Sequence, residues 1–244
     1  MAAPPSVFDQ ILASIVRGQY GPGARLPSER DLARTLGASR PTLREALKRL
    51  EQWNLLSTRR GSGVTVRDLR KDATLDVLPA YLRFGAVALG PERLGRVVQD
   101  VLRLRRGLVV ETVRTLGDRL TPGSLDGARR ALHAAAALRG QRGFVAADLE
   151  VMRHVFAAAD FLPGQWLLNS IQRIYVEIGE LVTARTVVPD DYIPAHEGAF
   201  SALEAGDVER AARRFGDYLT AHDENLLGAL GLAPAKPKKV SHAV

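Results

Sequence analysis

The chain has 244 residues, of which 46% are hydrophobic and 25% are charged, and it contains no cysteine. This length suggests one or two domains with a sizeable core, and the cysteine count excludes a disulfide framework, a thiolate metal site and a cysteine nucleophile. The first residues contain no basic leader, and charged residues interrupt every apolar run before 18 residues. We therefore expect a cytoplasmic protein with no signal peptide and no membrane partner.

The formal net charge of +7 is distributed unevenly. Residues 6–70 hold 12 Lys and Arg against 6 Asp and Glu, whereas residues 71–234 hold 19 against 21. Three more lysines lie in the last ten residues. A basic first domain beside a nearly neutral body is typical of a protein that binds a polyanion through its N-terminal part.

Two short helices are predicted at the start of the chain. The stretch VFDQILASIVRG places its apolar residues on one helical face and ends at a glycine. After a Gly-Pro-Gly loop, LPSERDLARTLG offers Ser28 as an N-cap, with Asp31 three residues later, and Gly37 as the stop. Both helices therefore have a buried side and a defined end.

A third helix and a two-stranded ribbon follow. In GASRPTLREALKRL, Ser39 is a new N-cap and Pro41 is tolerated because the first-turn amides have no partner within the helix. The apolar residues Leu43, Ala46, Leu47 and Leu50 repeat at helical spacing. The period then changes to alternation in LLSTRRGSGVTVRD, where Gly-Ser-Gly predicts a hairpin turn.

The third helix carries a basic ridge opposite its leucines. Arg40, Arg44 and Lys48 are four residues apart and so share one face. A helix fits the major groove of DNA, where arginine pairs with guanine, and a basic hairpin suits the neighbouring minor groove. A solvated basic face is the alternative for any single helix. The order of helix, turn, basic helix and basic ribbon in one basic domain favours DNA binding.

At this point the sequence resembles a known family. The stretch GARLPSERDLARTLGASRPTLREALKRLEQWNLLSTRRGSGVTV is similar to the winged helix-turn-helix of GntR-family transcription regulators. It departs from that pattern at Asn54, where a glycine is usual, and at Pro41, where Thr or Ala is frequent. The resemblance implies a set of residues that contact double-stranded operator DNA: Ser28, Arg30, Ser39, Arg40, Pro41, Thr42, Arg44, Arg60 and Gly61.

The remainder is predicted to be helical. Helical patterns recur at 91–118, 122–139, 143–159, 165–187, 193–205 and 207–230, with no further strand. The predicted fold is therefore mainly α: a winged helix-turn-helix domain of three helices plus a β-hairpin over residues 6–68, followed by an all-α helical bundle over residues 91–230. Residues 69–90 are predicted to be a linker or connector helix, and the basic residues 231–244 a disordered tail.

The helical domain resembles the effector domain of the FadR branch of the GntR family, through HEGAFSALEAGDVERAARRFGDYLTAH and VLRLRRGLVVETV. Many members of that branch bind a divalent metal such as Zn, Ni or Mn through an Asp, a His four residues later and two further His. The resemblance selects Asp148, His196 and His222, but Met152 stands where the second ligand is expected. Methionine is a poor ligand for such metals, so a metal site and a hydrogen-bonded core remain alternatives.

A second resemblance concerns the effector. SIQRIYVEIGELV is similar to part of the acyl-CoA pocket of FadR, which implies roles for Tyr175 and Gly179, and Arg105 matches an arginine that often points into the pocket of the family. An arginine can pair with a carboxylate. A core role for Tyr175 is the alternative. The implied effector is either a small carboxylate metabolite or a fatty acyl-CoA.

These observations predict a homodimeric, ligand-responsive transcription regulator, by default a repressor, that binds a palindromic operator. One alternative is a metal-dependent hydrolytic enzyme that uses Asp148, His196 and His222. No glycine-rich phosphate loop or nucleophile motif supports an enzyme. Another alternative is a nonspecific nucleic-acid-packaging protein that binds through its basic tail.

Overall fold

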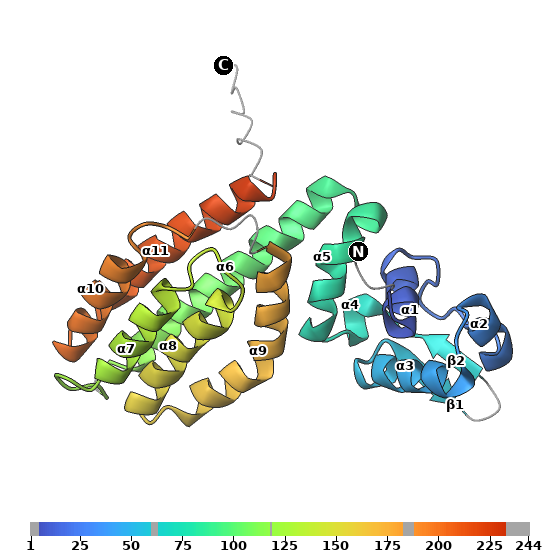
Figure 1. Cartoon of the computed structure of the whole chain (residues 1–244), viewed down its shortest axis with the longest axis horizontal. Helices are drawn as coiled ribbons and strands as arrows, with labels where there is room; N and C mark the ends of the chain where they lie inside the picture. The colour runs from blue at the N-terminus through green and yellow to red at the C-terminus, as the bar shows by residue number, and fades with distance from the viewer. Residues whose placement is uncertain (1–4, 60–62, 118, 183–187, 233–244) are drawn as a thin grey trace, which may run out of the picture. The chain divides into compact units, whose positions relative to one another are not determined.

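The computed structural model describes residues 5–59, 63–117, 119–182 and 188–232, and the chain divides into two compact units, residues 1–94 and 95–244 (Figure 1). The first unit contains α1 (Val7–Val16), α2 (Glu29–Thr35), α3 (Arg40–Gln52), β1 (Leu56–Arg59), β2 (Gly63–Val66), α4 (Leu69–Asp72), a 3-10 turn (Leu75–Val77) and α5 (Leu78–Leu89). The second contains α7 (Asp126–Ala136), α8 (Phe144–Ala158), α9 (Leu162–Val182), α10 (Tyr192–Glu204), α11 (Val208–Ala229) and all but the first turn of α6 (Pro91–Thr115).

The helices of the first unit begin and end where local chemistry dictates. The Ser28 hydroxyl accepts from the Asp31 amide at 3.2 Å, and the Ser39 hydroxyl accepts from the Thr42 amide at 3.2 Å. Gly37 ends the second helix at φ 61°. Asn54 follows the third at φ 57°, so it does adopt the left-handed conformation that glycine would supply at this position.

The core of the first unit follows the predicted stripes. The apolar residues of the third helix are all buried: Leu43, Ala46, Leu47 and Leu50. The two strands pair antiparallel with Leu56 opposite Val66, and an isolated bridge between Arg25 and Thr65 ties the preceding loop to this ribbon. The ribbon and helices therefore share one core and hold α3 by its leucine side.

The segment that follows the ribbon is also part of this unit. Ala80 of α5 is buried in the same core, and Tyr81 and Phe84 pack against it. The Arg17 guanidinium at the end of α1 lies 5.4 Å from the Phe84 ring centre. The residues predicted as a connector thus form α4, the 3-10 turn and α5, and α5 packs on α1.

The second unit is an all-helical bundle, as predicted, and no strand occurs beyond Val66 among the residues described. Its core joins α7, α8, α10 and α11 around fully buried side chains such as Leu132, Phe200 and Leu203. Arg129 of α7 donates to both carboxylate oxygens of Glu204 on α10, at 3.0 and 2.9 Å. This bidentate pair fixes two helices that lie far apart in sequence.

In the described part of the chain, every helix is too short or too polar to cross a lipid bilayer.

Candidate functional sites

The exposed face of α3 and the loop before it carry the residues that the sequence analysis selected. All of the described members of that set are exposed to solvent: Ser28, Arg30, Ser39, Arg40, Pro41, Thr42 and Arg44. The leucines of the same helix point into the core. The structure therefore leaves these residues accessible on α2, α3 and their N-caps, while Arg60 and Gly61 fall outside the described residues.

The arginines of this face differ in their partners. The Arg44 Nε donates to a carboxylate oxygen of Glu29 on α2 at 2.8 Å, and both side chains remain largely exposed. The Arg30 Nε lies 3.9 Å from a carboxylate oxygen of Asp31. Within the described residues Arg40 makes no ion pair. Because exposed ion pairs contribute little free energy, Arg44 can exchange Glu29 for another anion at small cost.

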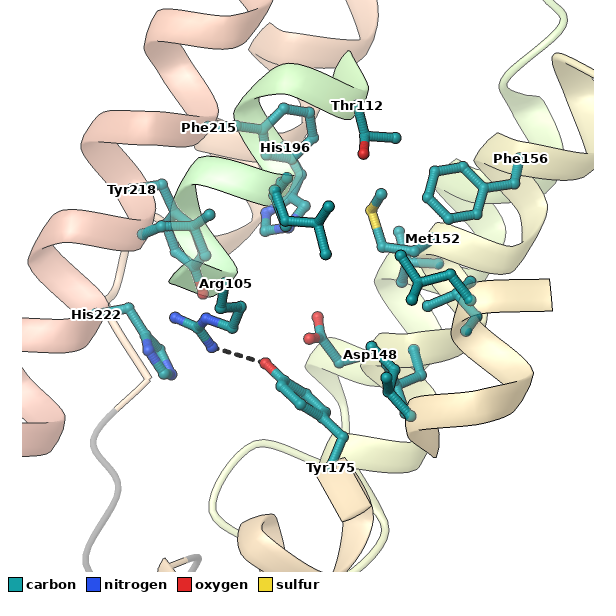
Figure 2. A pocket seen from close by; sticks show the side chains of 18 of the residues that line it. Arg105, Thr112, Asp148, Met152, Phe156, Tyr175, His196, Phe215, Tyr218 and His222 are labelled. Carbon is teal, nitrogen blue, oxygen red and sulfur yellow. Dashed lines mark hydrogen bonds between the residues drawn. The ribbon is translucent and has the colours of Figure 1, made fainter. Parts of the chain in front are cut away.

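A second candidate site is a cavity of about 130 Å³ inside the helical unit (Figure 2). It lies among α6, α8, α9, α10 and α11, and most of its wall is apolar. Two wall residues, Leu108 of α6 and Leu167 of α9, are 44% and 37% exposed. The cavity therefore reaches the surface between these helices, and its apolar wall with a few polar groups is typical of a small-molecule site.

One end of the cavity is polar. The Arg105 guanidinium donates to the Tyr175 hydroxyl at 2.7 Å, and the dashed line of Figure 2 marks this bond. It also donates to Asp223, whose other carboxylate oxygen accepts from Arg106 at 3.3 Å. One buried carboxylate thus neutralises part of the charge of two guanidinium groups.

Two other lining residues, Asp148 and His196, are linked by hydrogen bonds through Tyr192. The Tyr192 hydroxyl donates to Asp148 at 2.7 Å, and the His196 Nδ1 donates to the Tyr192 carbonyl at 2.7 Å. Burial and the neighbouring Asp148 carboxylate raise the pKa of the Tyr192 hydroxyl, which therefore stays protonated. Burial lowers the pKa of His196, so its imidazole is neutral near pH 7.

Two buried nitrogen atoms lack a hydrogen-bond partner in the described part of the chain: the Arg105 Nε and the His222 Nδ1. The His222 Nδ1 lies 3.8 Å from an Asp223 oxygen, beyond hydrogen-bond distance. Both residues line the cavity. These two atoms are themselves buried, so the surface that each residue turns to the cavity belongs to its other atoms.

The metal prediction does not fit this arrangement. Asp148, His196 and His222 do line the same cavity, but Figure 2 shows them on separate walls. Among the described residues, no three His, Asp or Glu side chains are grouped so that they can hold a metal ion. The reason is local: Tyr192 occupies the Asp148 carboxylate, and Met152 lines the cavity where a further ligand was expected.

The effector residues expected from the sequence are placed as follows. Arg105 and Tyr175 line the cavity and are bonded to each other. Gly179 belongs to α9, but its surroundings lie outside the described residues. The sequence analysis missed Tyr192 and Asp223. Asp223 shares the helical repeat of buried Phe215 and Leu226 on α11, and this periodicity is the signal that could have identified it.

Comparison with known proteins identifies the two domains that contain these candidate sites. Residues 5–66 match the model of the bacterial regulatory proteins of the gntR family, and residues 100–221 match the FCD domain. The HTH-type transcriptional regulator Mce2R of Mycobacterium tuberculosis is 30% identical over 234 residues, covering 94% of this chain and 93% of that protein. The fatty acid metabolism regulator protein of Cronobacter sakazakii is 28% identical over 173 residues, 70% of this chain and 68% of that protein.

A solved structure supports the fold. Lar, which controls the expression of the Listeria monocytogenes agr system, has a TM-score of 0.51 with this chain at 14% identity, covering 91% of this chain and 95% of that chain. The family and its named members indicate a regulator rather than an enzyme. The chain belongs to the GntR family of transcription regulators, in its FadR-like branch, with a winged helix-turn-helix domain that binds DNA and an FCD domain that binds a small-molecule effector.

Proposed function

We propose that this regulator binds a palindromic operator as a homodimer and that an effector in the cavity of the helical unit controls this binding. The observation that carries the DNA part is the exposed face of α3, where Arg40 and Arg44 stand opposite buried leucines. A helix held by its apolar side presents its basic side to the major groove, where arginine reads guanine bidentately.

The hydroxyl groups at the start of α3 support the same reading. Ser39 and Thr42 are exposed at its N-terminus, and their hydroxyls lie 2.8 Å apart. The amides of a helix N-terminus and its dipole favour a phosphate there. Phosphate contacts at this end would fix the register of the helix, and the arginines further along would read the bases.

The dimer follows from the geometry that such a helix requires. One recognition helix covers only a few base pairs, and two helices related by a two-fold axis read inverted half-sites about one DNA turn apart. An effector that binds the two arrangements of the dimer unequally shifts their populations. We propose that the protein represses transcription and that effector binding relieves this repression.

The effector is an amphiphile with a carboxylate or carbonyl head, as either a small carboxylate or an acyl-CoA provides. The apolar cavity walls suit its body, and the guanidinium group of Arg105, which lines the cavity, suits its head. The name of the Cronobacter relative, a fatty acid metabolism regulator, supports this class for the present chain.

The test begins with selection of genomic DNA fragments that bind the purified protein, followed by affinity measurement on the most enriched fragment. Arg44→Ala should abolish specific binding while the circular dichroism and sedimentation of the dimer stay unchanged. Arg70→Ala removes the same charge from exposed α4, outside the helix-turn-helix, and should retain specificity. Unchanged operator affinity in Arg44→Ala would refute the assignment of α3.

A further inference from the structure

The wing, defined here as β1 and β2, is bonded to other parts of the first unit along both of its outer edges. At its base the Arg67 amide donates to the Leu55 carbonyl at 2.9 Å. Pairs in an antiparallel ladder alternate, so Thr58 and the opposite Val64 turn their amide and carbonyl groups outward, away from each other. These outward groups are free to bond to neighbouring segments of the chain.

The two edges of the wing use different partners. On β2, the Val64 carbonyl accepts from the Leu26 amide at 2.9 Å, so the loop before α2 covers that edge. On β1, the Thr58 amide donates to the Glu51 carboxylate at 2.9 Å. Glu51 lies in the last turn of α3, the helix that we propose enters the major groove. The Glu51 side chain therefore links the recognition helix directly to the wing.

The position of Glu51 is unfavourable for α3 itself. The C-terminal end of a helix carries partial negative charge, so its last turn favours a cation and disfavours a carboxylate. The side chain is also exposed, and it adds a negative charge to a domain that binds DNA. Neither helix stability nor attraction of DNA explains a glutamate at this position, whereas the bond to the Thr58 amide does.

The short connection between α3 and β1 fixes the base of the wing. Asn54 reverses the chain at φ 57°, and the Leu55 amide donates to the Leu50 carbonyl at 2.9 Å. Thr58 lies three residues beyond Leu55, which is about 10 Å along an extended strand. A bond that far from the base limits rotation of the wing relative to α3 more strongly than a bond at the base does.

Taking the proposed DNA contact of α3 as given, we infer that Glu51 is a positioning residue for operator recognition. Through the Thr58 amide it holds the wing at one angle to α3, so that the wing meets the neighbouring minor groove while α3 occupies the major groove. Its carboxylate touches neither base nor phosphate in this role. Because the two DNA-contacting elements are already aligned in the free protein, less conformational entropy is lost on binding.

The test compares two substitutions that remove the same charge. Glu51→Gln keeps a carbonyl oxygen that can accept from the Thr58 amide, whereas Glu51→Leu has a side chain without an acceptor. On the operator selected from genomic DNA, Glu51→Leu should bind at least about fivefold more weakly than Glu51→Gln, which corresponds to one hydrogen bond of about 1 kcal/mol. A difference below about twofold would overturn the inference.

Footprinting at saturating protein separates positioning from simple loss of affinity. Hydroxyl radicals report the sugars that are protected in the minor groove, and dimethyl sulfate reports the guanines that are covered in the major groove. Glu51→Leu should lose the minor-groove protection beside each half-site and keep the major-groove protection, whereas Glu51→Gln should keep both. Loss of both protections in Glu51→Leu, or of neither, would overturn the inference.

The donor side of the bond provides an independent variant. Thr58→Pro removes the amide hydrogen, and proline is tolerated on an edge strand whose amide points away from the paired strand. It should weaken operator binding as Glu51→Leu does, and the double variant should lose no more than either single variant. Additive losses would contradict the inference. Gln52→Leu, exposed at the next position of α3, is the control and should retain both affinity and footprint.

Failure of this inference differs from failure of the proposed function. A wild-type protein that selects no operator would refute the DNA contact of α3. A wild-type protein that selects one, with Glu51→Leu and Thr58→Pro binding it as Glu51→Gln does, would refute only the role of Glu51. Circular dichroism and urea unfolding of each variant establish that it is folded before affinities are compared.

Discussion

Two ion pairs, one at the candidate site of each unit, differ in how far they are exposed to water. On the DNA-binding unit, the side chains of Arg44 and Glu29 are 63% and 40% exposed, whereas in the helical unit those of Arg105 and Asp223 are 18% and 6% exposed. An exposed pair contributes roughly 0–1 kcal/mol, and water or a phosphate replaces either partner easily. A buried pair costs several kcal/mol to break because the remaining charge stays in an apolar environment.

This difference matches what each unit has to do. A surface that meets many DNA sequences needs charges that exchange partners quickly. A cavity that discriminates between small molecules needs groups held in one place by bonds that do not exchange. Substitutions in the two units should therefore change stability by very different amounts.

The largest effect is expected from Asp223→Ala. It leaves the guanidinium groups of Arg105 and Arg106 without their shared carboxylate, so the free energy of unfolding of the helical unit should fall by about 3–5 kcal/mol. Urea unfolding followed by circular dichroism measures this loss. Asp217→Ala, exposed on the same helix, is the control and should change little. Equal stability of the two variants would mean that the buried pair is not structural.

The dependence of stability on pH should also distinguish the helical unit from the DNA-binding unit. Because burial lowers the pKa of His196 from its ordinary 6.5, the folded helical unit keeps this imidazole neutral while the unfolded chain takes up a proton below about pH 6.5. Stability is then fully present above that pH and falls as pH drops below it, by up to about 1.4 kcal/mol per pH unit. Thermal unfolding between pH 7.5 and 5.5 measures the slope, and His196→Gln should flatten it. An unchanged slope in that variant would assign the proton to another group.

A smaller loss is expected at the start of α3. Ser39→Ala removes the side-chain acceptor for the Thr42 amide and should destabilise the first unit by about 1 kcal/mol. Chemical unfolding of the full chain provides the measurement, with Ser201→Ala, exposed on α10, as a control that leaves this unit unchanged. If Ser39→Ala had no effect, water would have to replace the cap without penalty.

The first unit was predictable from sequence because its signals are local. Caps at Ser28 and Ser39, a stop at Gly37 and the repeat of leucines each lie within one helix, and the structure has all of them. In the helical unit, helix positions were predictable in the same way. The family resemblance also pointed to Arg105 and Tyr175, which the structure brings together across 70 positions of sequence.

What sequence could not supply were partners brought together only by tertiary packing. Tyr192 lies in a stretch that reads as a loop, VVPDDYIP, yet its hydroxyl reaches Asp148 on another helix, 44 positions away. Asp223 reads as a polar residue on the last helix, yet it binds arginines of α6. No periodicity within one helix determines which residue of another helix lies opposite it. The two contacts hold Asp148 and Arg105, which do line the cavity.

The smallest change in stability should accompany the most informative change in DNA binding. Glu29→Gln removes the carboxylate that holds Arg44, and because both side chains are exposed the free energy of unfolding should change by less than about 0.5 kcal/mol. The surface that faces the duplex then carries one negative charge fewer, and Arg44 is no longer held in one orientation by Glu29. Affinity for an unrelated duplex should rise and the ratio of operator to unrelated affinity should fall, both measured by fluorescence anisotropy at several salt concentrations.

Glu45→Gln is the matched control for that experiment. It removes an exposed carboxylate from α3 itself, where Glu45 pairs with Lys48 at 3.0 Å, and it leaves the Glu29–Arg44 pair intact. The loss of one negative charge should tighten nonspecific binding in both variants, but only Glu29→Gln should reduce the operator ratio. If both variants reduced it equally, Glu29 would act through charge alone, and the orientation of Arg44 on free α3 would have no part in sequence recognition.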